Sequence, residues 1–121
     1  MRLLLVDDDR MNVDLFVAAL ESDGHAVTVE RDGEAGRARA LREPFDLVLL
    51  DLQLPRLDGY AVFRALRAAG AAVPIVALTS AALPEQIARG KAAGFDAYLT
   101  KPITPRALRD AVRRYARGPA G

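Results

Sequence analysis

Side chains able to do chemistry follow four short apolar runs of this sequence, each at the point where the run ends. They are the carboxylates Asp7, Asp8, Asp9 and Asp51, the hydroxyls Thr79, Ser80 and Thr100, and the amine Lys101. Two carboxylates about 5 Å apart repel each other by ~3 kcal/mol at an effective dielectric constant near 20. If these acids gather in one place, they need counter-charges, which Lys101 and a hard divalent cation can supply.

This set of groups suits phosphoryl transfer. Carboxylate oxygen is the ligand that Mg²⁺ prefers, and a magnesium site with open positions is characteristic of enzymes and switches that move phosphoryl groups. One carboxylate can act as the nucleophile and form an aspartyl-phosphate. Thr79 can donate a hydrogen bond to a phosphoryl oxygen, and Lys101 can share the charge.

Strands and helices that alternate along the chain must position these groups. Apolar runs of strand length are Leu3–Val6, Ala26–Val29, Leu47–Leu50, Ile75–Leu78 and Ala97–Leu99. Segments with helical spacing lie between and after them, at Asn12–Ser22, Gly33–Arg42, Asp58–Ala69, Pro84–Ala93 and Thr104–Ala116. Alternating strands and helices predict a doubly wound parallel sheet covered by helices. Its carboxyl edge, where open α/β sheets bind ligands, gathers the polar groups.

The composition bounds the protein class. A chain of 121 residues with 51% hydrophobic residues predicts a single globular domain, with a core over about 3–116 and a tail at 117–121. The net charge of +1 gives no sign of nucleic-acid or membrane binding, and the absence of cysteine excludes disulfides and thiolate metal sites. No signal peptide or membrane-length apolar stretch is present, so we expect a cytoplasmic protein.

Four motifs carry a resemblance to a known family. "LLLVDDDRMN", "DLVLLDLQLPRLDGY", "PIVALTS" and "AYLTKPI" closely resemble the receiver domain of two-component response regulators. The resemblance runs from Leu3 to about Tyr115. It implies the CheY-like, flavodoxin-type fold: five parallel strands in the order 2-1-3-4-5, flanked by five helices.

The resemblance also implies a role for each matching residue of the acidic site. Asp51 is the phospho-acceptor, and Asp7 and Asp8 hold Mg²⁺ (or Mn²⁺), Asp7 partly through water. Asp51 and the backbone carbonyl of Gln53 complete the metal ligands contributed by the chain. Gln53 has an unusual side chain for its position, which leaves the lifetime of the aspartyl-phosphate open.

Further residues match the switch of this family. Thr79 is the hydroxyl that moves toward the phosphoryl group, and Tyr98 is the aromatic side chain whose rotamer follows it, although ordinary packing is the alternative for Tyr98. Lys101 contacts a phosphoryl oxygen, and Asp51 before phosphorylation. The Lys101–Pro102 peptide bond is implied to be cis.

The remaining acids have simpler interpretations. We expect Asp9 to be a solvated loop residue or a charge at a helix N-terminus. Asp58 is interpreted as a helix-start acid and Gly59 as a backbone requirement, not as ligands. Ser80 is small enough to leave the phosphoryl site open.

The partners follow from the resemblance. A histidine kinase or a histidine phosphotransfer protein is the donor, and Met11 and Leu15 on the first helix are candidate docking residues, unless they pack inside. The output passes through the fourth helix, fifth strand and fifth helix to a protein whose identity is open. We expect no direct binding of nucleic acid, because no basic recognition helix follows.

Several alternatives stay open. The chain is either a stand-alone regulator or a receiver cut from a longer protein such as a hybrid histidine kinase. We expect no enzyme activity beyond its own phosphotransfer and dephosphorylation. A phosphorylation-independent interaction module on the same fold is the main alternative. A small aspartate-nucleophile phosphatase is disfavoured, because Gln53 stands where its second acid would be.

Overall fold

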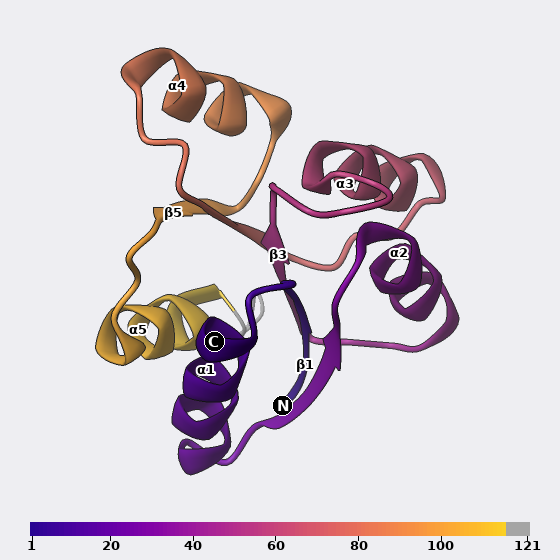
Figure 1. The fold of residues 1–121 in the computed structure, drawn as a ribbon. Coiled ribbons are helices and arrows are strands. Elements are labelled where there is room, and N and C mark those ends of the chain that lie inside the picture. Colours follow the sequence, from indigo (N-terminus) through magenta and orange to yellow (C-terminus); the bar gives the residue numbers. More distant parts are fainter. Residues whose placement is uncertain (116–121) are drawn as a thin grey trace.

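The five strands form where short runs of Leu, Val and Ile occur in the sequence. They are β1 (Arg2–Val6), β2 (Ala26–Glu30), β3 (Leu47–Asp51), β4 (Ile75–Thr79) and β5 (Ala97–Thr100). All pair in parallel, in the order β2-β1-β3-β4-β5, which confirms the predicted topology (Figure 1). Every residue of β3 and β4 is buried, as expected for inner strands covered on both faces.

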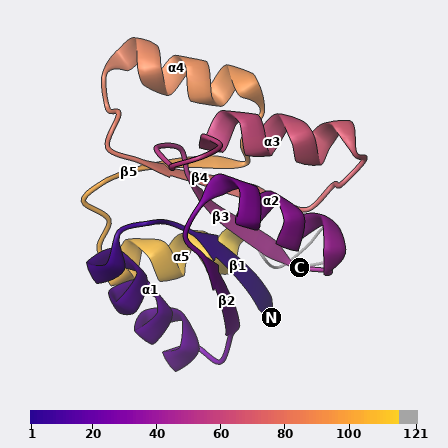
Figure 2. The ribbon, with the colours of Figure 1, turned by 45° about the vertical axis from the view of Figure 1, so that its right-hand side comes forward.

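Five helices alternate with the strands, as the sequence predicts. They are α1 (Arg10–Ser22), α2 (Gly33–Arg42), α3 (Gly59–Ala68), α4 (Pro84–Ala93) and α5 (Pro105–Tyr115). Helices α1 and α5 lie on one side of the sheet, and α2, α3 and α4 lie on the other (Figure 2). The computed structural model describes residues 1–115. The predicted tail at 117–121 and residue 116, where the predicted core and last helix end, therefore lie outside the described residues.

The hydrophobic core has two halves, one on each face of the sheet. The half under α1 and α5 is built from Leu3, Leu5, Leu47, Leu49, Val76, Leu78, Val13, Phe16, Leu20, Leu108 and Val112. The half under α3 is built from Leu4, Val6, Val48, Leu50, Ile75, Ala77, Val62, Phe63 and Leu66. Alternate residues of one strand thus serve opposite faces, which fixes the register of the sheet.

Several boundaries differ by one or two residues from the prediction, and two of these differences matter for the site. Helix α1 begins at Arg10, two residues before the predicted start, because the Asp9 side chain caps it. Strands β2, β3, β4 and β5 each run one residue further than predicted. Asp51 and Thr79 are therefore the last residues of rigid strands and not loop residues.

None of the helices in the described part of the chain has both the length and the apolar character needed to cross a membrane.

Candidate functional site

Two buried acids and one lysine meet at the carboxyl edge of the sheet. Asp7 follows β1 and is fully buried, and Asp51 ends β3 with 3% of its surface exposed. The Lys101 ammonium, which follows β5, lies 3.0 Å from Asp51 Oδ2 and 3.2 Å from Asp7 Oδ2. Residues separated by 50 and 94 positions in the chain thus form one ion-paired group.

Asp8 completes a cluster that fits a divalent cation. One carboxylate oxygen from each of Asp7, Asp8 and Asp51 lies within 4.8 Å of the others. Asp8 is exposed, which leaves the cluster open to solvent on one side, whereas Asp7 and Asp51 are buried. Three hard oxygen donors with an open side are the kind of set that Mg²⁺ and Mn²⁺ accept.

The charges of the site perturb its titration. Burial raises the pKa of the Asp7 carboxyl above its ordinary value, and the nearby Asp51 charge raises it further. The hydrogen bond from the Asp9 N–H and the Lys101 ammonium lower this pKa, but they do not outweigh burial and Asp51. Burial alone would lower the pKa of the Lys101 ammonium, but its hydrogen bonds to Asp51 and Asp7 and their charges outweigh burial and raise it. Lys101 therefore stays charged at neutral pH.

Backbone N–H groups near each acid orient the carboxylates of Asp7 and Asp51. The Gln53 N–H donates to Asp51 Oδ1 at 2.8 Å, and the Asp9 N–H donates to Asp7 Oδ1 at 2.9 Å. Each acid is thus held by the N–H two residues further along the chain. Gly59 lets α3 start against β3, because a Cβ there would lie 2.5 Å from the Asp51 carbonyl oxygen. The prediction that Gly59 is a backbone requirement is confirmed.

The two neighbouring acids that were set aside as non-ligands cap helices. Asp9 Oδ1 accepts from the N–H groups of Met11 and Asn12, and Asp58 Oδ1 accepts from the N–H of Ala61. Capping satisfies donors that the first turn of a helix leaves free. Of the two interpretations offered for Asp9, the charge at a helix N-terminus is confirmed.

Thr79 and Tyr98 are both bonded to one residue of the loop between β4 and α4. Thr79 is fully buried, and its Oγ1 accepts from the Ala81 N–H at 3.1 Å. The Tyr98 hydroxyl donates to the Ala81 carbonyl at 3.0 Å. Both side chains also line a hollow of about 230 Å³ beside Gln53. The Lys101–Pro102 peptide bond, next to this group, is cis.

A contact across the site was not anticipated from the sequence. Ser80 Oγ donates to Gln53 Oε1 at 2.6 Å, which joins the loop after β3 to the loop after β4. Ser80 thus does more than leave the site open, because it orients the Gln53 amide. No local pattern in the sequence signals this pair, since it depends on how two loops meet.

The candidate docking residues lie outside the core. Met11 is 82% exposed and Leu15 is 49% exposed on α1, so the alternative that they pack inside is wrong. They lie in the first and second turns of the helix that Asp9 caps, beside the acidic site. Large apolar side chains in such a position are available to a partner.

Comparisons with known proteins agree with this geometry. Residues 3–113 match the family model of the response regulator receiver domain. The chain is 36% identical over 121 residues to the transcriptional regulatory protein RprY of Bacteroides fragilis. This alignment covers 98% of this chain and 51% of RprY. The chain spans about half, or less, of the length of the first curated relatives it matches.

Solved structures give the same result. The receiver domain of sensor histidine kinase PA1611 from Pseudomonas aeruginosa has a TM-score of 0.86 and 38% identity, covers 95% of this chain and 96% of its own, and has a magnesium ion coordinated in its active site cleft. The chemotaxis response regulator CheY4 of Vibrio cholerae has a TM-score of 0.87 and 29% identity over 94% of this chain and 97% of its own.

Proposed function

Because this chain belongs to the response regulator receiver family, we propose that it is a signalling switch whose phospho-acceptor is Asp51. The observation that carries the proposal is the Asp51 carboxylate itself. It ends a buried strand, pairs with Lys101 at 3.0 Å and lies beside the acids Asp7 and Asp8. A nucleophile in this position has its counter-charges already in place.

The proposed metal is Mg²⁺ or Mn²⁺, held by the carboxylates of Asp7, Asp8 and Asp51 and by the backbone carbonyl of Gln53. When bound, such a cation offsets the charge of the transferred phosphoryl oxygens. The Gln53 N–H that donates to Asp51 orients the carboxylate whose other oxygen faces Lys101.

The proposed reaction is a phosphotransfer from a phosphohistidine donor. An Asp51 carboxylate oxygen forms a bond to phosphorus as the bond between phosphorus and the imidazole nitrogen breaks, and the electron pair stays on that nitrogen. Lys101 neutralises charge on a phosphoryl oxygen. Water later attacks phosphorus and releases inorganic phosphate. The chain catalyses this transfer to itself and its own dephosphorylation by hydrolysis, and we propose no other enzyme activity.

The donor in this proposal is a histidine kinase or a histidine phosphotransfer protein. Met11 and Leu15 are the proposed contacts for its histidine-bearing helix, because they are exposed apolar residues on α1 next to the acidic site. Phosphorylation shifts a two-state equilibrium in which Thr79 moves toward Asp51 and Tyr98 follows. The downstream partner is a protein that reads the face made by α4, β5 and α5.

Labelling of Asp51 tests the proposal. The wild-type chain should take up a Mg²⁺-dependent, hydroxylamine-labile phosphoryl group from a cognate donor, and Asp51→Asn should take up none while keeping the far-ultraviolet circular dichroism of the wild type. Asp58→Asn is the matched control, because Asn also caps α3 at a position close to the site. Labelling of Asp51→Asn at the wild-type level would refute the assignment.

A further inference from the structure

Gly90 of α4 is packed closely against Tyr98 of β5. Among the ten residues of this helix it is the buried one. A Cβ built on Gly90 would lie 2.2 Å from both Cδ2 and Cε2 of Tyr98, a separation that real side chains do not adopt. Glycine is a poor residue for the interior of a helix, so it needs a packing reason there, and the Tyr98 ring supplies one.

The hydroxyl end of Tyr98 reaches Ala81 in the loop between β4 and α4, which we call the switch loop. Its hydroxyl holds the Ala81 carbonyl, while the Ala81 N–H is held by Thr79 Oγ1. The loop residue Ala81 therefore has two side-chain attachments, one to the inner strand β4 and one to Tyr98. If Thr79 turns toward a phosphoryl group on Asp51, the first attachment is lost and Tyr98 is the one that remains.

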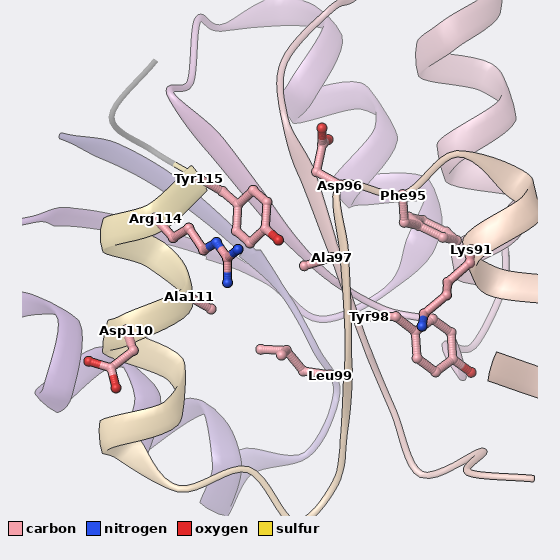
Figure 3. Close-up of a pocket in the computed structure, with 10 residues that line it drawn as sticks. All are labelled: Lys91, Phe95, Asp96, Ala97, Tyr98, Leu99, Asp110, Ala111, Arg114 and Tyr115. Atoms are coloured by element: carbon pink, nitrogen blue, oxygen red, sulfur yellow. The ribbon is translucent and has the colours of Figure 1, made fainter. Parts of the chain in front are cut away.

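The ring also separates two hollows. Tyr98 lines the hollow of about 230 Å³ beside Thr79 and a groove of about 550 Å³ over β5. Figure 3 shows this groove, with Lys91 and Tyr98 near α4 on one side and Arg114 and Tyr115 of α5 on the other. A change in the ring position therefore alters both the switch loop and the face that is proposed to signal.

We propose that Gly90 is a positioning residue for the switch. Because Gly90 has no side chain, the Tyr98 ring can pack against α4 and keep the Tyr98 hydroxyl on the Ala81 carbonyl. We call this position of the ring the seat. The seated ring is the rotamer that Tyr98 takes when it follows Thr79 in the proposed switch, so the seat stabilises the arrangement in which Thr79 has turned toward Asp51 over arrangements in which the ring lies elsewhere. This inference rests on the proposed function of Asp51.

Binding of beryllofluoride, a phosphoryl mimic, with Mg²⁺ tests the inference. Gly90→Ala should bind the mimic roughly fivefold or more weakly than the wild type, which is the lower end of coupling between linked sites. In a Tyr98→Ala background, Gly90→Ala should leave the affinity unchanged, because the ring it displaces is absent. Equal affinities of Gly90→Ala and wild type overturn the inference, as does the same loss in both backgrounds.

Stability provides a second, independent measurement. Alanine is the better helix former, so Gly90→Ala should raise the urea midpoint in the Tyr98→Ala background and lower it in the Tyr98 protein. A change of the urea midpoint with the same sign in both backgrounds overturns the inference. Ala92→Gly, at an exposed position of the same helix, changes helix propensity by a similar amount and should leave mimic affinity unchanged.

The outcomes separate the two proposals. If the wild type fails to bind the mimic, or if Asp51→Asn binds it equally well, the proposed function fails and this inference fails with it. If the wild type binds and Asp51→Asn does not, the function stands, and the Gly90 variants alone decide whether the seat is coupled to the site.

Discussion

Asp7→Asn should make the metal-free protein more stable and at the same time remove its response to Mg²⁺. Asp7 is a fully buried carboxylate whose pKa is raised by burial and by the charge of Asp51. A group whose pKa is higher in the folded chain contributes stability that is complete below its unfolded pKa and is lost as pH rises through the folded value. At neutral pH the ionised Asp7 is therefore a cost to the metal-free fold.

The structure gives the size of both effects. Oxygens of Asp7 and Asp51 lie within 4.8 Å. At that distance two unit charges repel by about 3 kcal/mol at an effective dielectric constant near 20. Lys101 lies 3.2 Å from Asp7, and its attraction of about 5 kcal/mol at the same dielectric constant outweighs this repulsion. The cost of the ionised Asp7 therefore comes mainly from its burial. We expect Asp7→Asn to raise the free energy of unfolding without metal on the order of 1 kcal/mol.

The metal reverses the order of stability. At a concentration one hundred times its dissociation constant, Mg²⁺ stabilises the wild type by about 2.7 kcal/mol. For a domain of this size that is a rise in Tm of roughly 10 °C. If Asp7→Asn weakens binding a hundredfold, the same concentration adds only about 0.4 kcal/mol. The variant is thus the more stable protein in EDTA and the less stable one in Mg²⁺.

Thermal unfolding followed by circular dichroism, with EDTA and with Mg²⁺, measures all four values. Repeating the EDTA series from pH 4 to pH 7 tests the titration. The wild type should lose stability relative to Asp7→Asn as pH rises above 3.8, the ordinary pKa of aspartate. A metal-free Asp7→Asn protein less stable than the wild type at pH 7, or a full Mg²⁺ response in the variant, would refute the reasoning.

Asp9→Asn is the matched control, because it makes the same change two positions along the chain. Asp9 caps α1 through its side chain, and Asn caps a helix about as well as Asp. The control should therefore keep the wild-type Mg²⁺ response. If it loses the response as well, Asp9 belongs to the metal site, and the assignment of two acids from this run is wrong.

Two further predictions concern the loop after β3 and the surface of α1. Arg56 has a φ of 71°, in the left-handed region that side chains other than Gly and Asn disfavour, so Arg56→Asn should raise the free energy of unfolding by about 0.5–1 kcal/mol in urea titrations; a decrease would contradict this. Leu15→Lys should slow phosphotransfer from a phosphohistidine protein about tenfold, as loss of a buried interface anchor does, yet leave labelling by a small phosphodonor unchanged. Leu41→Lys, which alters a similarly exposed leucine on the opposite side of the sheet, should affect neither rate. Equal slowing by both substitutions would argue against docking on α1.

The residues at the carboxyl edge of the sheet could be predicted because their placement follows from the order of strands and helices along the chain. Each apolar run marks a strand, strands joined by helices are parallel, and parallel strands end at one edge. Asp7, Asp51, Thr79 and Lys101 could therefore be brought together from their order in the chain alone. The resemblance added roles to these positions, but the pattern by itself predicts their proximity.

Contacts that depend on loop conformation and rotamer could not be predicted in the same way. The bond from Ser80 to Gln53 joins two loops whose approach is set by the whole sheet. Ala81 acts through its backbone, which no side-chain pattern reveals. Gly90 did carry a signal, a glycine inside a helical segment, but its partner Tyr98 could be identified only in three dimensions.

The charges of the site show why a neutral hydroxyl donor suits the proposed switch. Three carboxylates and one ammonium leave two negative charges, which one divalent cation neutralises. A phosphoryl group on Asp51 replaces one carboxylate charge with about two, so the balanced site gains roughly one negative charge. Thr79 Oγ1 now accepts from the Ala81 N–H, which leaves its own hydrogen free to donate. It is the buried neutral donor at the end of the adjacent strand, and turning toward the new oxygens releases Ala81. In the proposed switch, the excess charge on Asp51 is therefore converted into a movement of the loop between β4 and α4.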